Sequence, residues 1–304
     1  MEKFEVIILG CGSALPTVKH NLSAQAVNFR DKLFLIDCGE GTQLQYRAMK
    51  LNFSKLNRIF ISHLHGDHCF GLPGLISTLG MLGRTADLHI HTPADAETVF
   101  GPLLDYFCRE LPFKVFFEPF DTRKNKVVYE DKSLKISTIP LKHRVPSAGF
   151  LFEEKPAFPH IVREMIDFYN VPIAKIKEIK EGADFVTPDG KVVPNDRLTT
   201  PADPPRRYAY CSDTAYYEKI VSIIEKADLL YHEATFCNDD LKRAKETFHS
   251  SALQAASIAK MAQVKKLLIG HFSARYPDEK ILLNEAREVF PNTELANEGK
   301  KLKV

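Results

Sequence analysis

The run Ser62-His63-Leu64-His65-Gly66-Asp67-His68 constrains this chain more than any other feature. It follows the apolar segment 58–62 (RIFIS), so a buried strand is predicted to end there and deliver the first histidine to a loop. Gly66 lets the loop bend, and the four metal-competent side chains can converge in two pairs, one for each of two ions. Imidazole and carboxylate suit zinc, with manganese or iron as alternatives. A polar loop with incidental histidines is disfavoured, because a strand end seldom gathers four such ligands by chance.

Three further candidate ligands stand at other predicted strand ends. His143 follows STIPLK, Asp213 follows YAYCS, and His271 follows KLLIG. A carboxylate such as Asp213 can bridge two cations that lie roughly 3.5 to 4 Å apart and share a hydroxide. Asp37 also ends a strand pattern, where it can accept a hydrogen bond from a ligand histidine and orient it. The sequence therefore predicts a dinuclear metal site built from strand ends.

Glu233 and His249 form a second kind of candidate, because each lies beside small polar residues, in EAT and HSS. A glutamate hydrogen-bonded to a histidine gives an imidazole whose pKa suits proton donation. The other histidines are assigned structural or solvated positions: His89 and His91 in a strand, His20 and His160 in loops, and His232 in the core or beside a ligand.

Strand and helix patterns alternate over the whole chain, which predicts sheets covered by helices. Strands are predicted at 4–9, 32–36, 58–62, 88–91, 127–129, 134–140, 207–211, 229–231 and 266–269. Helices are predicted at 42–49, 216–227, 251–262 and 279–289.

Residues 153–207 interrupt this rhythm with eight prolines, and a Pro188-Asp189-Gly190 turn there predicts a hairpin. A helix at 161–169 and a lysine-bearing piece at 174–180 are also expected. We interpret 153–207 as an arm inserted into a single domain that spans 1–304. The alternative is a long surface excursion without a function.

Composition and charge exclude several other classes of protein. Hydrophobic residues make up 44% of the 304 residues and charged residues 26%, so the chain is expected to fold around a core. A net charge of +2 provides no general polycationic field for nucleic acid, so local patches would have to bind it. The six cysteines form no CxxC pair, and no apolar run approaches the roughly 20 residues of a membrane span. Because MEKFEVIILG is typical of a strand and not of a signal peptide, a cytoplasmic location is the expectation.

With these residues placed, the chain resembles the metallo-β-lactamase superfamily and, within it, the ribonuclease Z family of endonucleases that mature tRNA 3′ ends. HLHGDH alone indicates the superfamily. The narrower resemblance covers residues 9–290 and rests on FLIDCGEGTQ at 34–43, GLPGL at 71–75, HEAT at 232–235, HSS at 249–251 (with Ser in place of Thr) and HFSARY at 271–276.

The resemblance implies an α/β fold, an αβ/βα sandwich of two mixed sheets with outer helices and a protruding arm. It also implies two zinc ions per chain, one bound by His63, His65 and His143 and the other by Asp67, His68 and His271, with Asp213 bridging. Asp67 would help to activate the water. His249, held by Glu233, would protonate the leaving oxygen.

Substrate contacts follow from the same resemblance. The family's Pro-x-Lys-x-Arg-Asn loop corresponds to 16–21 (PTVKHN), where lysine is displaced by one place and His replaces Arg. It implies phosphate contacts by Lys19, His20 and Asn21, and the HFSARY stretch adds Ser273 and Arg275.

The arm corresponds to the element that holds the tRNA body in the bacterial family. Residues 153–207 contain nine Lys/Arg against ten Asp/Glu, so a basic stripe of Lys175, Lys177 and Lys180 would have to contact the RNA. The resemblance also implies a homodimer in which one subunit's arm grips the tRNA cut by the other.

The predicted function is therefore a zinc-dependent endoribonuclease that removes the 3′ trailer from tRNA precursors and leaves a 3′-hydroxyl on the tRNA. Two alternatives remain. A small-molecule phosphodiesterase or lactonase of the same fold would need neither the arm nor the HEAT and HSS boxes. A non-catalytic RNA-binding member would be expected to lose metal ligands, and this sequence keeps all seven.

Overall fold

The computed structural model describes residues 3–304, which form two compact units. The larger unit contains residues 3–129, 136–152 and 207–304. The smaller unit contains residues 130–135 and 153–206, so it comprises almost all of the predicted arm.

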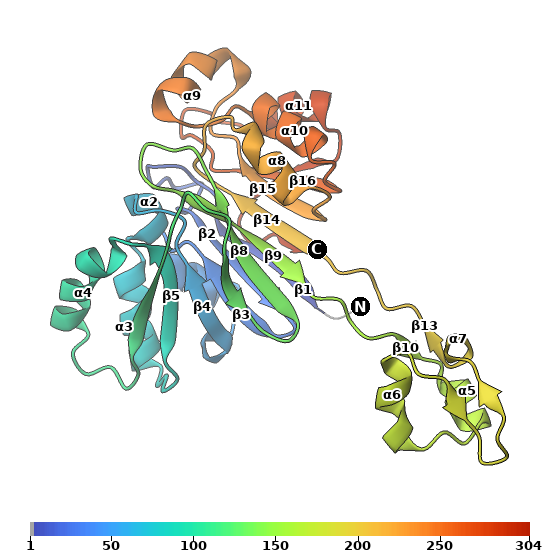
Figure 1. Ribbon diagram of the computed structural model, residues 1–304. Coiled ribbons are helices and arrows are strands. Elements are labelled where there is room, and N and C mark those ends of the chain that lie inside the picture. The colour runs from blue at the N-terminus through green and yellow to red at the C-terminus, as the bar shows by residue number, and fades with distance from the viewer. Residues whose placement is uncertain (1–2) are drawn as a thin grey trace. The chain divides into compact units, whose positions relative to one another are not determined.

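The first sheet of the larger unit is mixed and has seven strands (Figure 1). They are β1 (Phe4–Gly10), β2 (Ala24–Phe29), β3 (Lys32–Ile36), β4 (Leu56–Phe60), β5 (Leu88–Pro93), β6 (Val115–Phe120) and β18 (Lys301–Lys303). Their order is β18-β1-β2-β3-β4-β5-β6, with antiparallel pairing up to β3 and parallel pairing from β3 to β6.

The second sheet also has seven strands. They are β7 (Val127–Glu130), β8 (Leu134–Pro140), β9 (Ala148–Glu154), β14 (Arg207–Cys211), β15 (Leu229–Glu233), β16 (Lys266–Gly270) and β17 (Thr293–Leu295). The order is β17-β16-β15-β14-β9-β8-β7, and β14 to β17 are parallel. The carboxyl ends of β14, β15 and β16 therefore lie at one edge of the sheet.

Helices cover the outer face of each sheet, which completes the predicted sandwich (Figure 1). On the first sheet lie α1 (Thr42–Ala48), α2 (Gly66–Cys69), α3 (Leu72–Met81) and α4 (Ala96–Phe107), and with the second lie α8 (Val221–Ile224), α9 (Leu241–Thr247), α10 (Ala252–Met261) and α11 (Lys280–Val289). α10 begins with a capping box in which Ser251 accepts from the backbone of Gln254, whose side chain accepts in return from Ser251 N.

Aromatic side chains fill the space between the sheets. Phe60 on β4 lies with its ring centroid 5.3 Å from that of Phe150 on β9, and Phe34 on β3 lies 6.0 Å from Phe152. All four rings are completely buried. The predicted α/β sandwich fold is thus confirmed, and its core joins strands from both halves of the chain.

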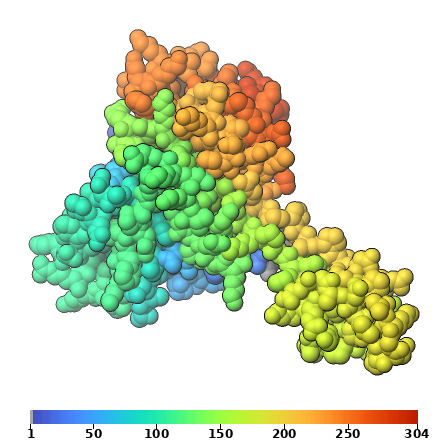
Figure 2. All heavy atoms as spheres, in the orientation of Figure 1, coloured from blue at the N-terminus to red at the C-terminus, as the bar shows by residue number. Residues whose placement is uncertain are grey.

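Segments far apart in the sequence also meet at the surface of this unit. Figure 2 shows light-green atoms from the middle of the chain against orange atoms from its last third. One such contact is the hydrogen bond that the His143 ring donates from Nδ1 to the Phe248 carbonyl, at 3.0 Å.

The helix predicted at 216–227 is wrong in its extent. Only a 3-10 turn at Glu218–Ile220 and the four-residue α8 form there. Tyr217 is extended, with φ −145° and ψ 93°, and Lys226 has a left-handed φ of 55°, so the backbone leaves helical geometry on both sides. The strands β2, β6, β9, β17 and β18 were not predicted from the sequence.

The smaller unit has its own apolar cluster. It contains β10 (His160–Ile161), α5 (Arg163–Phe168), α6 (Ile176–Lys180), β11 (Phe185–Val186), β12 (Val192–Val193), α7 (Asn195–Leu198) and β13 (Thr199–Thr200). The predicted hairpin is confirmed as β11 and β12, with Gly190 at a left-handed φ of 84° in the turn. Six buried apolar side chains pack together, namely Ile166, Val171, Ile179, Phe185, Val193 and Leu198.

The two ends of this inserted segment are held together. Glu154 N donates to the Arg206 carbonyl at 2.9 Å, and the Arg206 guanidinium Nε lies 2.9 Å from a Glu154 carboxylate oxygen. Both side chains are about nine-tenths buried, so this ion pair is shielded from solvent. Within residues 3–304, no helix has the length and apolar character that crossing a membrane would need.

Candidate metal centre

Strand ends bring the candidate ligands together in the larger unit. Asp213 follows β14 and His271 follows β16, while the HLHGDH run follows β4. Asp213 and His271 have φ values of 57° and 61°, and Asp37, after β3, has 58°. Such left-handed conformations cost non-glycine residues about 1 to 3 kcal/mol each. The strained turns aim these side chains at one another.

The first group contains His63, His65, His143 and Asp213, whose ligand atoms all lie within 4.8 Å of one another. His65 Nδ1 lies 3.0 Å from His63 Nε2 and 3.2 Å from His143 Nε2. The Asp213 Oδ2 atom is 3.4 Å from His63 Nε2 and 3.6 Å from His143 Nε2. Three ring nitrogens and one carboxylate oxygen thus face a common point.

The second group contains Asp67, His68 and His271. The Nε2 atoms of His68 and His271 are 3.2 Å apart, and Asp67 Oδ2 lies 3.6 Å and 3.4 Å from them. Asp213 Oδ1 is 3.1 Å from each of these two nitrogens. Asp213 therefore presents one oxygen to each group, which is the arrangement of a bridging carboxylate.

The histidines of the first group are in the protonation state that binds a cation. Burial lowers the pKa of His63 and of His143, and burial together with the two neighbouring histidines lowers the pKa of His65 to about 4. The rings are therefore neutral near pH 7, and neutral imidazole is the form that binds metals. The donor set, three neutral histidines and a carboxylate, fits zinc.

The second group is more anionic. Burial disfavours a charged His68, but the carboxylates of Asp213, Asp37 and Asp67 raise its pKa well above the usual value. The pKa of Asp67 is lowered by His68 and His271 in spite of burial. Positive charge is therefore stabilised at this position, and a cation can supply it in place of a proton.

Asp37 orients the His68 ring through a hydrogen bond to its Nδ1 atom. Its completely buried carboxylate accepts from His68 Nδ1 at 2.7 Å, from Tyr210 OH at 2.6 Å, and from Ser62 N and Oγ at 2.7 and 3.0 Å. The hydrogen bond from Nδ1 fixes the ring so that Nε2 faces the second group. His232, by contrast, is buried and bonds through Nδ1 to the Glu233 carbonyl at 2.7 Å, away from both groups.

Glu233 and His249 form a hydrogen-bonded pair beside the ligands. His249 Nδ1 lies 2.9 Å from Glu233 Oε1, and the carboxylate also accepts from Thr214 N, Thr235 Oγ1 and Ser250 N. Although burial opposes it, Glu233 raises the pKa of His249 to about 9. The ring is therefore protonated near neutral pH, with Nε2 free of the glutamate. His249 also lies within ligand distance of Asp213 and His271, which makes a third possible metal grouping.

These residues line a cavity of about 710 Å³ that is open to the surface. His65, Asp67, His143, Asp213, His249 and His271 all border it. Ser273 and Arg275 lie on the same wall, where Arg275 forms an ion pair with Asp240 at 2.9 Å.

The predicted substrate contact of His20 needs correction. His20 is only 9% exposed, and its Nε2 and Nδ1 lie 2.9 Å from the carboxylates of Glu279 and Glu298. Hydrogen bonding to Glu298 raises the pKa of His20 against the effect of burial. The ring is therefore a charged clamp between loop 12–22 and the C-terminal segment, not a solvated residue, and neither nitrogen is left for a phosphate.

Its neighbours take part in the same clamp. Lys19 Nζ lies 2.5 Å from Glu279 Oε2, and Asn21 N donates to Glu298 at 2.9 Å. The loop fixed in this way carries Ala14, whose N–H donates to Asp67 Oδ2 at 2.8 Å. In the smaller unit, Lys175 and Lys177 pair with Glu178 and Glu181, and Lys180 is partly buried.

Sequence reasoning missed several residues that hold the site. Tyr210 and Ser62 bind Asp37, and Thr235 Oγ1 lies 3.0 Å from His271 Nδ1. Thr235 stands in the HEAT stretch and could have been singled out there. Nothing in the local pattern marks Tyr210, because its contact crosses between the two sheets.

Known proteins match over the full chain. A ribonuclease Z of Bacteroides thetaiotaomicron is 61% identical over 299 residues, covering 98% of this chain and 95% of the relative. A ribonuclease Z of Phocaeicola vulgatus is 60% identical over 304 residues, covering 100% and 98%. The family model for "Anti-Pycsar protein Apyc1" matches residues 4–160.

Solved structures share the fold. The short form of human tRNase Z has a TM-score of 0.71 at 24% identity, and the metallo-β-lactamase fold protein YhfI from Bacillus subtilis has 0.70 at 19%. In each comparison, 99% of both chains is covered. At these identities the likeness establishes the metallo-β-lactamase fold.

Proposed function

The chain belongs to the ribonuclease Z family, and from this membership we propose that its seven converging His and Asp side chains hold two zinc ions. Residues 4–160 also belong to the family described as anti-Pycsar protein Apyc1. The chain is a metal-dependent endoribonuclease that processes the 3′ ends of tRNA precursors. The observation that carries the two-ion proposal is Asp213, which presents Oδ1 to one ligand group and Oδ2 to the other.

Different residues carry out the proton transfers of the hydrolysis. When bound, the metal ions supply the positive charge that activates a water and stabilises the phosphoryl oxygens. Asp67, held by the Ala14 N–H, accepts the proton of the attacking water. The bond from phosphorus to the ribose 3′-oxygen breaks, and His249 gives its proton to that oxygen. The tRNA leaves with a 3′-hydroxyl, and the trailer keeps the phosphate.

A 3′-extended tRNA transcript tests this function directly. Protein reconstituted with metal is expected to cut it once, giving a tRNA with a 3′-hydroxyl and a trailer with a 5′-phosphate. Hydrolysis of small phosphodiesters or lactones without any cut in the transcript would favour the small-molecule alternative. RNA binding without any hydrolysis would favour a non-catalytic role.

Metal content is the first quantitative prediction. Elemental analysis of protein purified without chelator is expected to find close to two zinc ions per chain, because two donor sets share the Asp213 carboxylate. Asp213→Asn should lower the content of both ions, while Asp240→Asn, at a partly exposed carboxylate bonded to Arg275 and Tyr276, should leave it unchanged. A fully active protein with one ion per chain would contradict the bridging role.

We further propose that the chain works as a cytoplasmic homodimer and that the smaller unit holds the body of the tRNA. Support for the dimer comes from exposed apolar side chains on and next to α4, where Tyr106, Phe107 and Met81 are 67, 69 and 79% exposed. Such clusters are typical of protein interfaces.

Sedimentation analysis of the purified protein should show a dimer, and Phe107→Glu should shift it to a monomer. An unchanged dimer would exclude this surface, and a monomeric wild type would exclude the dimer.

A further inference from the structure

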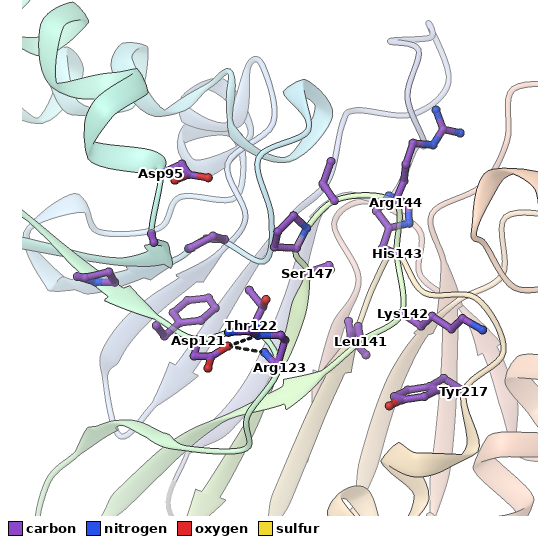
Figure 3. A pocket seen from close by; sticks show the side chains of 16 residues that line it. Asp95, Asp121, Thr122, Arg123, Leu141, Lys142, His143, Arg144, Ser147 and Tyr217 are labelled. Atoms are coloured by element: carbon purple, nitrogen blue, oxygen red, sulfur yellow. Dashed lines mark hydrogen bonds and ion pairs between the residues drawn. The ribbon is translucent and has the colours of Figure 1, made fainter.

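A second cavity opens beside the metal centre in the larger unit. Its volume is about 1050 Å³, and His143 and Arg144 line both cavities. The remaining walls come from residues 93–95, residues 119–123, loop 141–147 and Tyr217. Figure 3 shows Asp95, Asp121 and Tyr217 around this space. This volume reaches the upper end of the roughly 300 to 1,000 Å³ that is usual for ligand pockets. No step of the proposed hydrolysis uses this space.

Cationic side chains flank the shared histidine. Lys142 and Arg144 are both exposed, and no carboxylate among residues 3–304 pairs with either of them. The other charges at the cavity are Arg123, which lies 3.1 Å from Asp121, and the exposed Asp95 (Figure 3). The paired charges of Arg123 and Asp121 offset each other, so the lining keeps a positive surplus next to the metal centre. Lys142 and Arg144 directly precede and follow His143 in the chain, so this positive charge lies beside a candidate metal ligand.

Aromatic rings lie on the same cavity. Tyr217 and Phe120 contribute to its lining, and Lys219 Nζ sits 5.9 Å from the centre of the Tyr217 ring. Two hydrogen bonds fix the Tyr217 loop to the His143 loop: Ala215 N donates to the Lys142 carbonyl at 2.8 Å, and Lys142 N donates to Thr214 Oγ1 at 3.1 Å. These two hydrogen bonds therefore fix the position of the Tyr217 loop relative to Lys142 and His143.

A buried hydroxyl in the lining points to a ligand. Ser147 is 2% exposed, it borders the cavity, and its Oγ has no hydrogen-bond partner among the described residues. Most buried polar side-chain atoms in folded proteins are satisfied, so an unsatisfied hydroxyl is a site where a partner group is missing. A ligand with hydrogen-bonding edges would supply that partner.

We propose that this cavity binds the single-stranded 3′ trailer beyond its first nucleotide, with trailer phosphates on Lys142 and Arg144, a base on Tyr217, and Ser147 hydrogen-bonded to a base or sugar. The proposal rests on the proposed function. A double-stranded acceptor stem is too wide for such a pocket, whereas unstacked bases enter pockets and stack on aromatic side chains.

The position of His249 indicates that the trailer, and not the 3′ end of the tRNA, occupies the second cavity. His249 gives its proton to the 3′-oxygen of the tRNA, so the last tRNA nucleotide lies in the cavity that His249, Thr247 and Arg243 line. None of these three residues borders the second cavity. The trailer, on the other side of the scissile phosphate, is the part of the substrate left to fill it.

A trailer-length series tests the proposal on the full-length, metal-loaded protein. Precursors with one-nucleotide and eight-nucleotide trailers are compared in binding and single-turnover cleavage. The wild type is expected to bind the longer precursor about tenfold more tightly, as stacking of one or two bases would give. The double variant Lys142→Ala, Tyr217→Ala should lose this advantage and still bind and cut the one-nucleotide precursor like the wild type. Lys260→Ala, at an exposed lysine of α10 outside the lining, controls for the loss of charge.

Ser147→Ala provides a second readout that does not depend on charge. Removing a hydroxyl without a partner should leave the melting temperature unchanged or raise it, while lowering the preference for the long trailer about threefold. An equal loss for both precursors would place these residues against the tRNA body and overturn the proposal. So would a wild type without any preference for the longer trailer, or a double variant that keeps the preference. If the wild type cuts neither precursor, the proposed function itself has failed.

Discussion

His249→Ala is expected to lower the single-turnover rate of tRNA-precursor cleavage by roughly 10² to 10⁴, the usual worth of a general acid. The ribose 3′-oxygen is a poor leaving group unless it is protonated. His249 borders the metal-centre cavity, its Nδ1 is held by Glu233 at 2.9 Å, and Glu233 raises its pKa to about 9 in spite of burial. Its Nε2 proton is therefore available at neutral pH.

Leaving-group dependence separates this role from others. A nitrophenyl phosphodiester releases an anion that needs no proton, so His249→Ala should slow its hydrolysis far less than cleavage of RNA. His89→Ala, at a partly exposed histidine of β5 that is bonded to Glu118 of β6, is the matched control and should affect neither substrate. An equal loss on both substrates, or loss of a metal ion, would mean that His249 positions the phosphate or binds metal together with Asp213 and His271.

Deleting most of the smaller unit should abolish tRNA-precursor cleavage and leave hydrolysis of the nitrophenyl phosphodiester largely intact. Binding energy from a remote part of the substrate serves only the substrate that has that part. The design removes residues 157–204 and joins the ends with a short flexible linker, which keeps the Glu154–Arg206 ion pair. Circular dichroism and metal content check that the larger unit remains folded. Unchanged tRNA cleavage would exclude a role in holding tRNA.

A matched variant tests how the smaller unit contacts RNA. Lys175, Lys177 and Lys180 changed together to alanine should weaken tRNA binding and reduce its salt dependence if they form the basic stripe. Lys175 and Lys177 already pair with glutamates, and the unit exposes Phe168 and Ile173 at 74 and 91%. If only Phe168→Ala weakens binding, the contact is made by apolar stacking and not by charge.

The ligands could be predicted because each belongs to a local pattern, a strand that stops at a histidine or aspartate. Their pairing through Asp213 required the three-dimensional positions of β4 in the first sheet and of β14 and β16 in the second. His20 was misassigned for the same reason. Its partners Glu279 and Glu298 lie more than 250 residues further along the chain, and no local pattern announces a buried ion pair of that kind.

The fold was predictable where periodicity is strong. β3, β8 and β14 have the predicted bounds, because apolar runs end there at polar turns. β6 and β18 were missed: β6 has no completely buried residue, and β18 has three residues of which only Leu302 is buried. Pairing with a neighbouring strand, not an apolar run, defines such edges. The helix predicted at 216–227 is shorter than expected because its start lies in a loop that is hydrogen-bonded to Lys142 and its end turns at Lys226, which has a left-handed φ.

The left-handed turns at Asp37, Asp213 and His271 also have an evolutionary consequence. At His271, glycine or asparagine would relieve backbone strain, and selection for activity keeps the histidine there. Asp37 differs, because its carboxylate accepts four buried hydrogen bonds that glycine could not replace. A duplicated copy of the gene that no longer needed catalysis would therefore gain stability by drifting to glycine or asparagine at His271 and not at Asp37. Such a replacement in a relative would mark it as a pseudoenzyme before any assay, and reversion would be harder, because restoring the ligand would restore the strain as well.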